Sequence, residues 1–313
     1  MARVITLIGY DGSEAAEDAI RAASVLFPGA AAVVVSVRGI ALSVRDAAAA
    51  RAALPDDVIA SAVEQYEAAA ARAAARTAER GAGIARATGL DVTTAVVSAG
   101  SPWRGLLAAA REHEVAVIVC GASGRGAVSR AVLGSTTAAL LHGSPVPVLV
   151  VPADGFPGNG PVLIGYDGSE EARAAIAATA RLLPGRRAIV AHAWTSPVRR
   201  SFVGGSLLDA PLDEIQQVAQ DLDALFAGDA EELAEEGAAL AGELGLDAQP
   251  RAVEAPGAPW RGLHEAARAE GAALVAVGSR GRGAIAAAVL GSVSSGLAHN
   301  AALPVLVVGA PED

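Results

Sequence analysis

Each half of the chain alternates between short apolar runs and longer segments with a helical pattern. Continuous runs of Val, Ile and Leu are typical of strands that are buried on both faces, as in a parallel sheet. In the first half these runs lie at residues 4–8, 32–37, 92–97, 115–120 and 147–151. Helices are expected after residues 11–13, over the Ala-rich residues 57–88, after Ser101-Pro102 and after Gly134-Ser135. This order predicts an α/β fold with a doubly wound, open parallel sheet.

The same pattern occurs twice along the chain. The segment LIGYDGSEAAEDAIRAASVLFPG at residues 7–29 returns as LIGYDGSEEARAAIAATARLLPG at 163–185. The segment SPWRGLLAAAREHEVAVIVCGASGRG at 101–126 returns as APWRGLHEAARAEGAALVAVGSRGRG at 258–283. Pro and Gly cluster between the copies at residues 152–161, which is typical of a short linker. We therefore expect two tandem domains, residues 1–153 and 160–313, each with its own five-stranded sheet.

Each half ends in a short apolar strand, residues 147–151 and its copy 304–308. A strand of this kind at the edge of a sheet presents unpaired backbone groups that favour pairing with another strand. Because both copies belong to one chain, we predict that they pair with each other as an intramolecular pseudo-dimer about a pseudo-twofold axis. Other surfaces are then left for any homodimer.

Composition and charge narrow the classes of partner. The 24 basic residues are all Arg and face 34 acidic residues, for a formal net charge of −10. This balance argues against nucleic acid or an anionic membrane surface as the main partner. The absence of Lys excludes a P-loop and a Schiff base. The single Cys120 excludes an internal disulfide, and no apolar run is long enough to span a membrane, so we expect a cytoplasmic protein.

A glycine pattern follows the fourth strand of each half. Gly121, Gly124 and Gly134-Ser135 in the first half correspond to Gly278, Gly281 and Gly291-Ser292 in the second, with the spacing Gly-x2-Gly-x9-Gly-Ser. Bare backbone at the first two glycines, with positive φ, suits close approach to a phosphate. The third glycine precedes a helix whose free N–H groups favour an anion. Alternatively, the glycines only form turns and bind no ligand. The recurrence of the full spacing in the second half disfavours this alternative.

These motifs resemble those of the universal stress protein superfamily in its tandem, ATP-binding form, over nearly all of both halves. The Gly-x2-Gly-x9-Gly-Ser pattern, the Asp after the first strand and a last strand of the PVLVV type carry the resemblance. It implies a Rossmann-like sheet of order 3-2-1-4-5 and one ATP site per domain, with or without Mg²⁺. The residues implied to bind ATP in the first domain are Asp11, Val37, Gly121, Gly124, Arg125, Arg130, Gly134, Ser135 and Thr136. Those in the second are Asp167, Ala193, Gly278, Gly281, Arg282, Gly291, Ser292 and Val293.

Arginines near the glycines predict that the two sites are unequal. Arg125 and Arg282 correspond and place one cation beside each site. Arg130 lies within the nine-residue flap of the first half, where it could reach the terminal phosphates of a nucleotide. Arg280, which corresponds to Ser123, lies in the turn and is expected to point to solvent.

Other repeated residues have structural interpretations. His142 and His299 are expected to contact carbonyls at the end of the fourth helix, and Trp103 and Trp260 to anchor the third helix. Asp11 has the alternative role of capping the first helix with Ser13.

No catalytic residues and no metal-ligand cluster are expected, because the chain lacks a supported Ser-His-Asp pattern and a metal-binding motif. The sequence favours an ATP-binding regulatory or stress protein with at most slow hydrolysis. An ATP-dependent phosphoryl-transfer enzyme and a scaffold that binds no nucleotide remain the alternatives.

Overall fold

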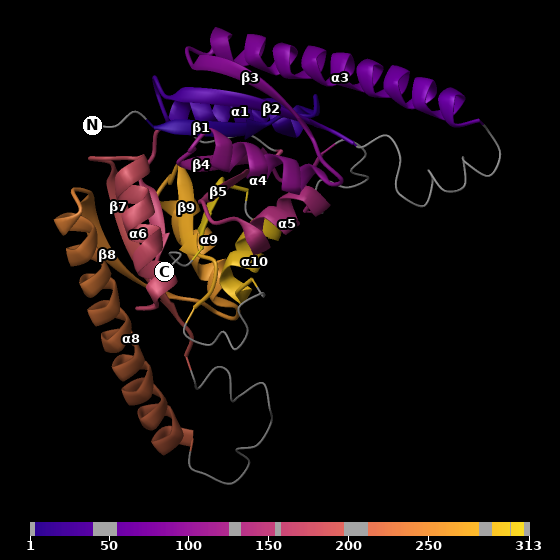
Figure 1. The fold of residues 1–313 in the computed structure, drawn as a ribbon. Helices are drawn as coiled ribbons and strands as arrows, with labels where there is room; N and C mark the ends of the chain where they lie inside the picture. The colour runs from indigo at the N-terminus through magenta and orange to yellow at the C-terminus, as the bar shows by residue number, and fades with distance from the viewer. Residues whose placement is uncertain are drawn as a thin grey trace.

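The computed structural model of the protein describes residues 4–39, 55–124, 133–153, 158–196, 212–281, 290–300 and 302–309. Its strands form one sheet in the order β3-β2-β1-β4-β5-β10-β9-β6-β7-β8, flanked by helices (Figure 1). Each half therefore has the order 3-2-1-4-5, which confirms the predicted doubly wound fold.

The elements of the two halves follow the same sequence along the chain. The strands of the first half are β1 (Ile5–Gly9), β2 (Ala31–Arg38), β3 (Asp91–Ser98), β4 (Val117–Gly121) and β5 (Val148–Val151). Its helices are α1 (Glu14–Leu26), α3 (Asp56–Ala87), α4 (Pro102–Glu112) and α5 (Ser135–Gly143). The strands of the second half are β6 (Val162–Gly165), β7 (Arg187–Trp194), β8 (Asp247–Glu254), β9 (Leu274–Gly278) and β10 (Val305–Val308). Its helices are α6 (Glu170–Leu182), α8 (Leu212–Glu243), α9 (Pro259–Ala269) and α10 (Ser292–Asn300).

The two halves meet at the pair β5–β10, the one antiparallel pair among the described strands. Val150 pairs with Val305, Leu149 with Leu306 and Val148 with Val307. Leu149 and Leu306 are copies of each other and lie directly opposite, so the pseudo-twofold axis passes between them. Their exposed fractions are 0% and 1%. The predicted intramolecular pseudo-dimer is confirmed, and the pairing joins the two five-stranded sheets into one.

The outer strands β3 and β8 depart from the expectation of burial on both faces. Every residue of each is exposed or half-buried, whereas all five residues of β4 are buried. The physical reason is position, because β3 and β8 are the two edges of the continuous sheet and each has a single neighbouring strand. The run at 92–97 predicted the strand correctly and its burial wrongly.

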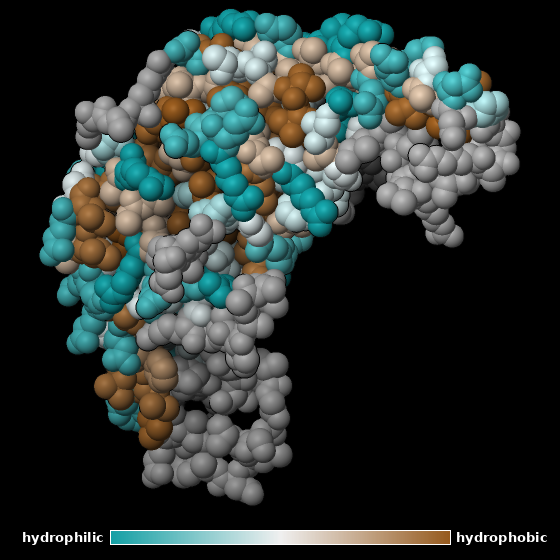
Figure 2. All heavy atoms as spheres, viewed as in Figure 1, coloured by the Kyte–Doolittle hydropathy of each residue, from teal (hydrophilic) through white to brown (hydrophobic). Residues whose placement is uncertain are grey.

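The longest helices, α3 and α8, pack on the outer strands and lie at opposite ends of the molecule (Figure 1). The first half of α8 carries exposed apolar side chains at Val218, Leu222, Leu225 and Phe226. Figure 2 shows apolar surface at this end of the helix, beyond the sheet. Within the described ranges, no helix combines the length and apolar character needed to cross a bilayer.

Candidate functional site

Two loops meet beyond the carboxyl ends of β1 and β4, which are neighbours in the sheet. The chain continues from β1 to β2 on one side and from β4 to β5 on the other, so this is the switch point where open α/β sheets bind ligands. Asp11 from the first loop faces the bare Cα of Gly124 from the second. A methyl group added at Gly124 would lie 3.0 Å from Asp11 Oδ2. In the second half, the carboxylate of Asp167 lies still closer to Gly281.

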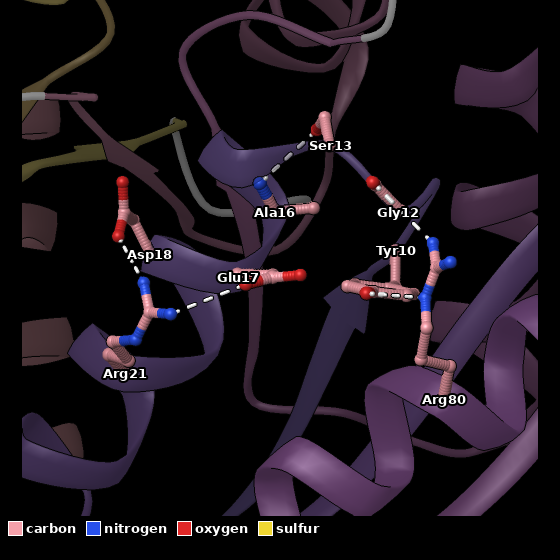
Figure 3. A network of polar contacts seen from close by, with 8 residues as sticks. All are labelled: Tyr10, Gly12, Ser13, Ala16, Glu17, Asp18, Arg21 and Arg80. Atoms are coloured by element: carbon pink, nitrogen blue, oxygen red, sulfur yellow. Dashed lines mark hydrogen bonds and ion pairs between the residues drawn. The ribbon is translucent and has the colours of Figure 1, made fainter.

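The two carboxylates are held by backbone and side-chain donors in their own loops. Asp11 Oδ1 accepts from Ser13 N at 2.9 Å, and Asp167 Oδ1 accepts from Ser169 N at 3.0 Å and from Ser169 Oγ at 2.5 Å. The helix caps are the serines, because Ser13 Oγ accepts from Ala16 N at 3.3 Å (Figure 3). Each Asp thus orders the turn before the helix and directs its second oxygen toward the glycine loop.

The ends of the glycine loop are tied to each other. Gly134 N donates to Ala122 O at 2.7 Å, and Thr137 Oγ1 donates to Gly121 O at 2.9 Å. A methyl group at Gly134 would lie 3.5 Å from Ala122 O and from Ser123 Cα, so glycine leaves the backbone of the loop uncovered. Thr137 is fully buried and was missed by sequence reasoning, although its position one residue after Gly-Ser-Thr was a usable signal.

The second half repeats this closure with a different hydroxyl. Gly291 N donates to Ser279 O at 2.8 Å, and Ser294 Oγ donates to Ser279 O at 2.9 Å. A methyl group at Gly291 would lie 3.2 Å from Arg280 Cα and 3.3 Å from Ser279 O. Ser294 corresponds to Thr137, so a hydroxyl at this position closes the loop in both halves.

The start of α5 offers donors to an anion. Its N-cap residue is Gly134, and no side chain caps the helix within the described residues. Gly124 and Ser135 are exposed, and Thr136 is half-buried. The first turn of α5, with its N–H groups and helix dipole, thus begins at the exposed Ser135 beside the glycine loop, an arrangement that favours a phosphate or another anion. In the second half Ser292 is likewise exposed, whereas Val293 replaces the hydroxyl of Thr136.

The expectation of positive φ at the motif glycines is wrong. None of Gly121, Gly124, Gly134 and their copies lies in the left-handed region, which is used instead by Gly12 (φ 84°) and Gly168 (φ 79°). At Gly121 the requirement is space, since a methyl group would lie 2.7 Å from backbone atoms of Ala15 in α1. Gly278 meets Glu171 in α6 at the same distance. The first glycine of each motif thus admits a helix. The second glycine, which is exposed at Gly124 and half-buried at Gly281, is the candidate for contact with a ligand.

Val37 and Ala193 lie at the ends of β2 and β7 and are half-buried. A methyl group at Gly105 would lie 2.7 Å from Val37 Cγ1, so Val37 packs against α4. The copy of Gly105, Gly262, meets Ala255 and Val253 instead, because Ala193 has no branched side chain to fill this space.

The long helices support the Asp loops with opposite charges. Arg80 of α3 donates from Nε to Tyr10 Oη at 3.2 Å and from Nη2 to Gly12 O at 3.5 Å (Figure 3). At the corresponding position, Glu236 of α8 accepts from Tyr166 Oη at 2.8 Å and pairs with Arg173. Burial, together with the bond to Glu236, raises the pKa of Tyr166 to about 12. Sequence reasoning missed this support, although the reversed charges at corresponding positions were a signal.

The predicted arginines divide into two groups. Arg125, Arg130 and Arg282 lie outside the described residues. Arg280 is described, and the expectation that it points to solvent is wrong. Its Nε lies 3.0 Å from Glu171 Oε1, with 24% of the Arg280 side chain and 14% of the Glu171 side chain exposed. The reason is the acidic residue in the first turn of α6, where the first half has Ala15.

The structural interpretations of the repeated His and Trp residues are supported. His142 Nδ1 lies 2.6 Å from Ala138 O, and His299 Nδ1 lies 2.8 Å from Ser295 O, as expected for the ends of α5 and α10. Trp260 of α9 packs against Gly296 of α10. Across the described ranges, no three His, Cys, Asp or Glu side chains form a group that could hold a metal ion.

Comparison with models of protein families shows which family the chain belongs to. The model of the universal stress protein family matches residues 5–152 and again residues 158–309. The chain belongs to the universal stress protein family. Universal stress proteins of Mycobacterium tuberculosis and of Mycobacterium bovis are each 33% identical to it over 203 residues, 62% of this chain and 62% of theirs. The chain thus spans less than two thirds of the length of these curated relatives.

Solved structures show the same tandem fold. A universal stress protein from Archaeoglobus fulgidus is similar over 97% of this chain and 98% of its own, with 19% identity and a TM-score of 0.63. A functionally unknown protein from Pseudomonas aeruginosa is similar over 99% of this chain and 94% of its own, with 15% identity and a TM-score of 0.53. At these identities the similarity shows the arrangement of elements and nothing of the ligand.

Proposed function

We propose that this universal stress protein is a cytoplasmic, ATP-binding regulatory protein with one nucleotide site in each of its domains, residues 1–153 and 160–313. The observation that carries the proposal is the repeated meeting of an ordered Asp, the second glycine of the motif and the start of a helix. In the first half these are Asp11, Gly124 and the turn at Ser135. In the second they are Asp167, Gly281 and the turn at Ser292.

The chemistry of these groups assigns parts of a nucleotide to parts of the site. A carboxylate repels phosphate and accepts hydrogen bonds from hydroxyl groups, so Asp11 suits the ribose. Backbone N–H groups of the glycine loop and the start of α5 suit the phosphates. The end of β2 at Val37 is then left for the base, as the family resemblance implies. ATP, with or without Mg²⁺, matches this order of groups, and any magnesium would rest mainly on the phosphates.

The expected role is nucleotide-dependent regulation with at most slow hydrolysis. A nucleotide that binds only the folded protein stabilises it by an amount that rises with the logarithm of the ligand concentration once this exceeds Kd, which is a physical route from nucleotide level to protein behaviour.

The test is the nucleotide content of the purified protein. The chain is purified without added nucleotide and precipitated with acid, and the supernatant is separated by ion-exchange chromatography. Release of ATP supports the proposal. Steady turnover of ATP with a second substrate would instead favour a phosphoryl-transfer enzyme. Absence of nucleotide together with no binding in titration would leave a scaffold as the better account.

A further inference from the structure

One contact at the glycine loops is present in a single half of the molecule. Arg280, in the loop after β9, forms an ion pair with Glu171 at the start of α6, and both side chains are largely buried. The corresponding residues of the first half are Ser123 and Ala15, which cannot form this pair.

The backbone around this pair is the same in both halves. A methyl group added at Gly121 would lie 2.7 Å from the carbonyl carbon and from Cβ of Ala15. The same group at Gly278 would lie 2.7 Å from the carbonyl carbon and from Cβ of Glu171. The two helices thus approach their loops equally closely, and the difference between the sites at this point lies in the side chains beyond Cβ.

The pair lies where the proposed function puts phosphates. Arg280 directly precedes Gly281, and Arg280 Cα is 3.2 Å from a methyl group added at Gly291, at the start of α10. A phosphate bound between the glycine loop after β9 and the start of α10 would attract the guanidinium of Arg280 and repel the carboxylate of Glu171. The carboxylate therefore competes with the phosphate for Arg280, and the competition grows with the charge of the ligand.

We propose that Glu171 is a specificity-determining residue that makes the second site discriminate against the more highly charged adenine nucleotides, whereas the first half has the uncharged Ala15 at this position. The proposal rests on the proposed function, because it assumes that the glycine loops of both halves bind phosphates. The two sites then differ in ligand preference. The first site is filled at a lower ATP concentration than the second, and the second retains a relative preference for ligands with fewer phosphates.

The experiment measures ATP, AMP and adenosine binding to the full chain by isothermal titration. Gly124→Val is present throughout, to block the first site so that the second is read alone. Glu171→Ala installs the residue of the first half. We expect it to raise the affinity for ATP at least fivefold and that for adenosine less than twofold. Glu171→Gln, which keeps the size of the side chain and removes its charge, should act in the same direction.

The reciprocal variants in the first site are the matched control, with the second site blocked by Gly281→Val. Ala15→Glu should lower ATP affinity at least fivefold, and adding Ser123→Arg should restore part of it. A role in loop order alone predicts a different result, since loosening the loop would change adenosine and ATP binding equally. Thermal melting of each variant verifies that it folds.

Three outcomes separate the claims. If Glu171→Ala and Glu171→Gln leave the affinities for ATP and for adenosine each within twofold of the parent, the role of Glu171 is refuted and the nucleotide sites stand. If the affinities for ATP and for adenosine change by the same factor of more than two, the ion pair orders the loop and the proposal is also refuted. If the unsubstituted chain binds none of the three ligands, the proposed function fails and this inference fails with it.

Discussion

The glycine loop after β4 contains a buried glycine, Gly121, and an exposed one, Gly124, so substitutions at the two positions can separate effects on stability from effects on ligand binding. A methyl group at Gly121 would lie 2.7 Å from three atoms of Ala15, two of them backbone, a distance that real Cβ contacts essentially never show. Helix α1 must therefore shift when Gly121→Ala is introduced, and overpacking of this kind costs about 1–3 kcal/mol. At Gly124 the added methyl group meets a single side-chain oxygen at 3.0 Å, and the residue is exposed. We expect Gly124→Ala to change the stability of the nucleotide-free protein by less than about 0.5 kcal/mol.

The assay is urea unfolding of the nucleotide-free chain, followed by circular dichroism, with ATP titration of the same samples. With a slope of roughly 2–3 kcal/mol/M for a chain of this size, the predicted loss for Gly121→Ala moves the midpoint by roughly 0.3–1.5 M. Gly124→Ala should leave the midpoint in place and weaken ATP binding. An unchanged midpoint for Gly121→Ala would refute the steric argument. A large loss of stability for Gly124→Ala would show that the second glycine also serves the fold.

Further predictions concern the core and the seam, which is the antiparallel pair β5–β10 that joins the two halves. Burial and the charge of Arg268 lower the pKa of His264 below its ordinary value of 6.5, so the folded protein loses stability as pH falls below about 6.5. His264→Leu should therefore reduce the difference between the melting temperatures at pH 7.5 and pH 5.5. An unchanged difference would contradict this. Burial raises the pKa of Cys120 to about 12, so maleimide at pH 8 should label it only after unfolding, and prompt labelling of the native protein would disprove the buried placement. Leu149→Ala and Leu306→Ala should each cost about 2–5 kcal/mol in urea unfolding, against less than about 0.5 for the exposed Leu225→Ala; equal effects would rule out a buried seam.

The fold was accessible from the sequence because its signals are local or repeated. Apolar runs predicted the strands, and the duplicated last strand predicted the seam at Leu149 and Leu306. The exposure of β3 was not accessible in this way, because an edge strand and a central strand can carry the same Val-rich run. Which neighbours a strand receives is decided by the assembled sheet.

The sequence pattern identified candidate residues for the site, but not what each of them contacts in the fold. The pattern identified Gly121 and Gly124 equally, yet one admits α1 and the other faces Asp11. That distinction depends on packing between elements far apart in the sequence. The same limit applies to Arg280, whose partner Glu171 becomes a neighbour only when α6 packs beside the loop after β9.

The central claim is that each half binds an adenine nucleotide between its Asp and its glycine loop, and one titration tests it most directly. The nucleotide-free chain and the double variant Gly124→Val/Gly281→Val are titrated with ATP in a calorimeter, after melting curves have shown that both are folded. The account predicts two ATP molecules per unsubstituted chain, and affinity lower by tenfold or more in the double variant, a loss of about 1.4 kcal/mol or greater per site. Unchanged affinity and stoichiometry in the double variant would contradict it.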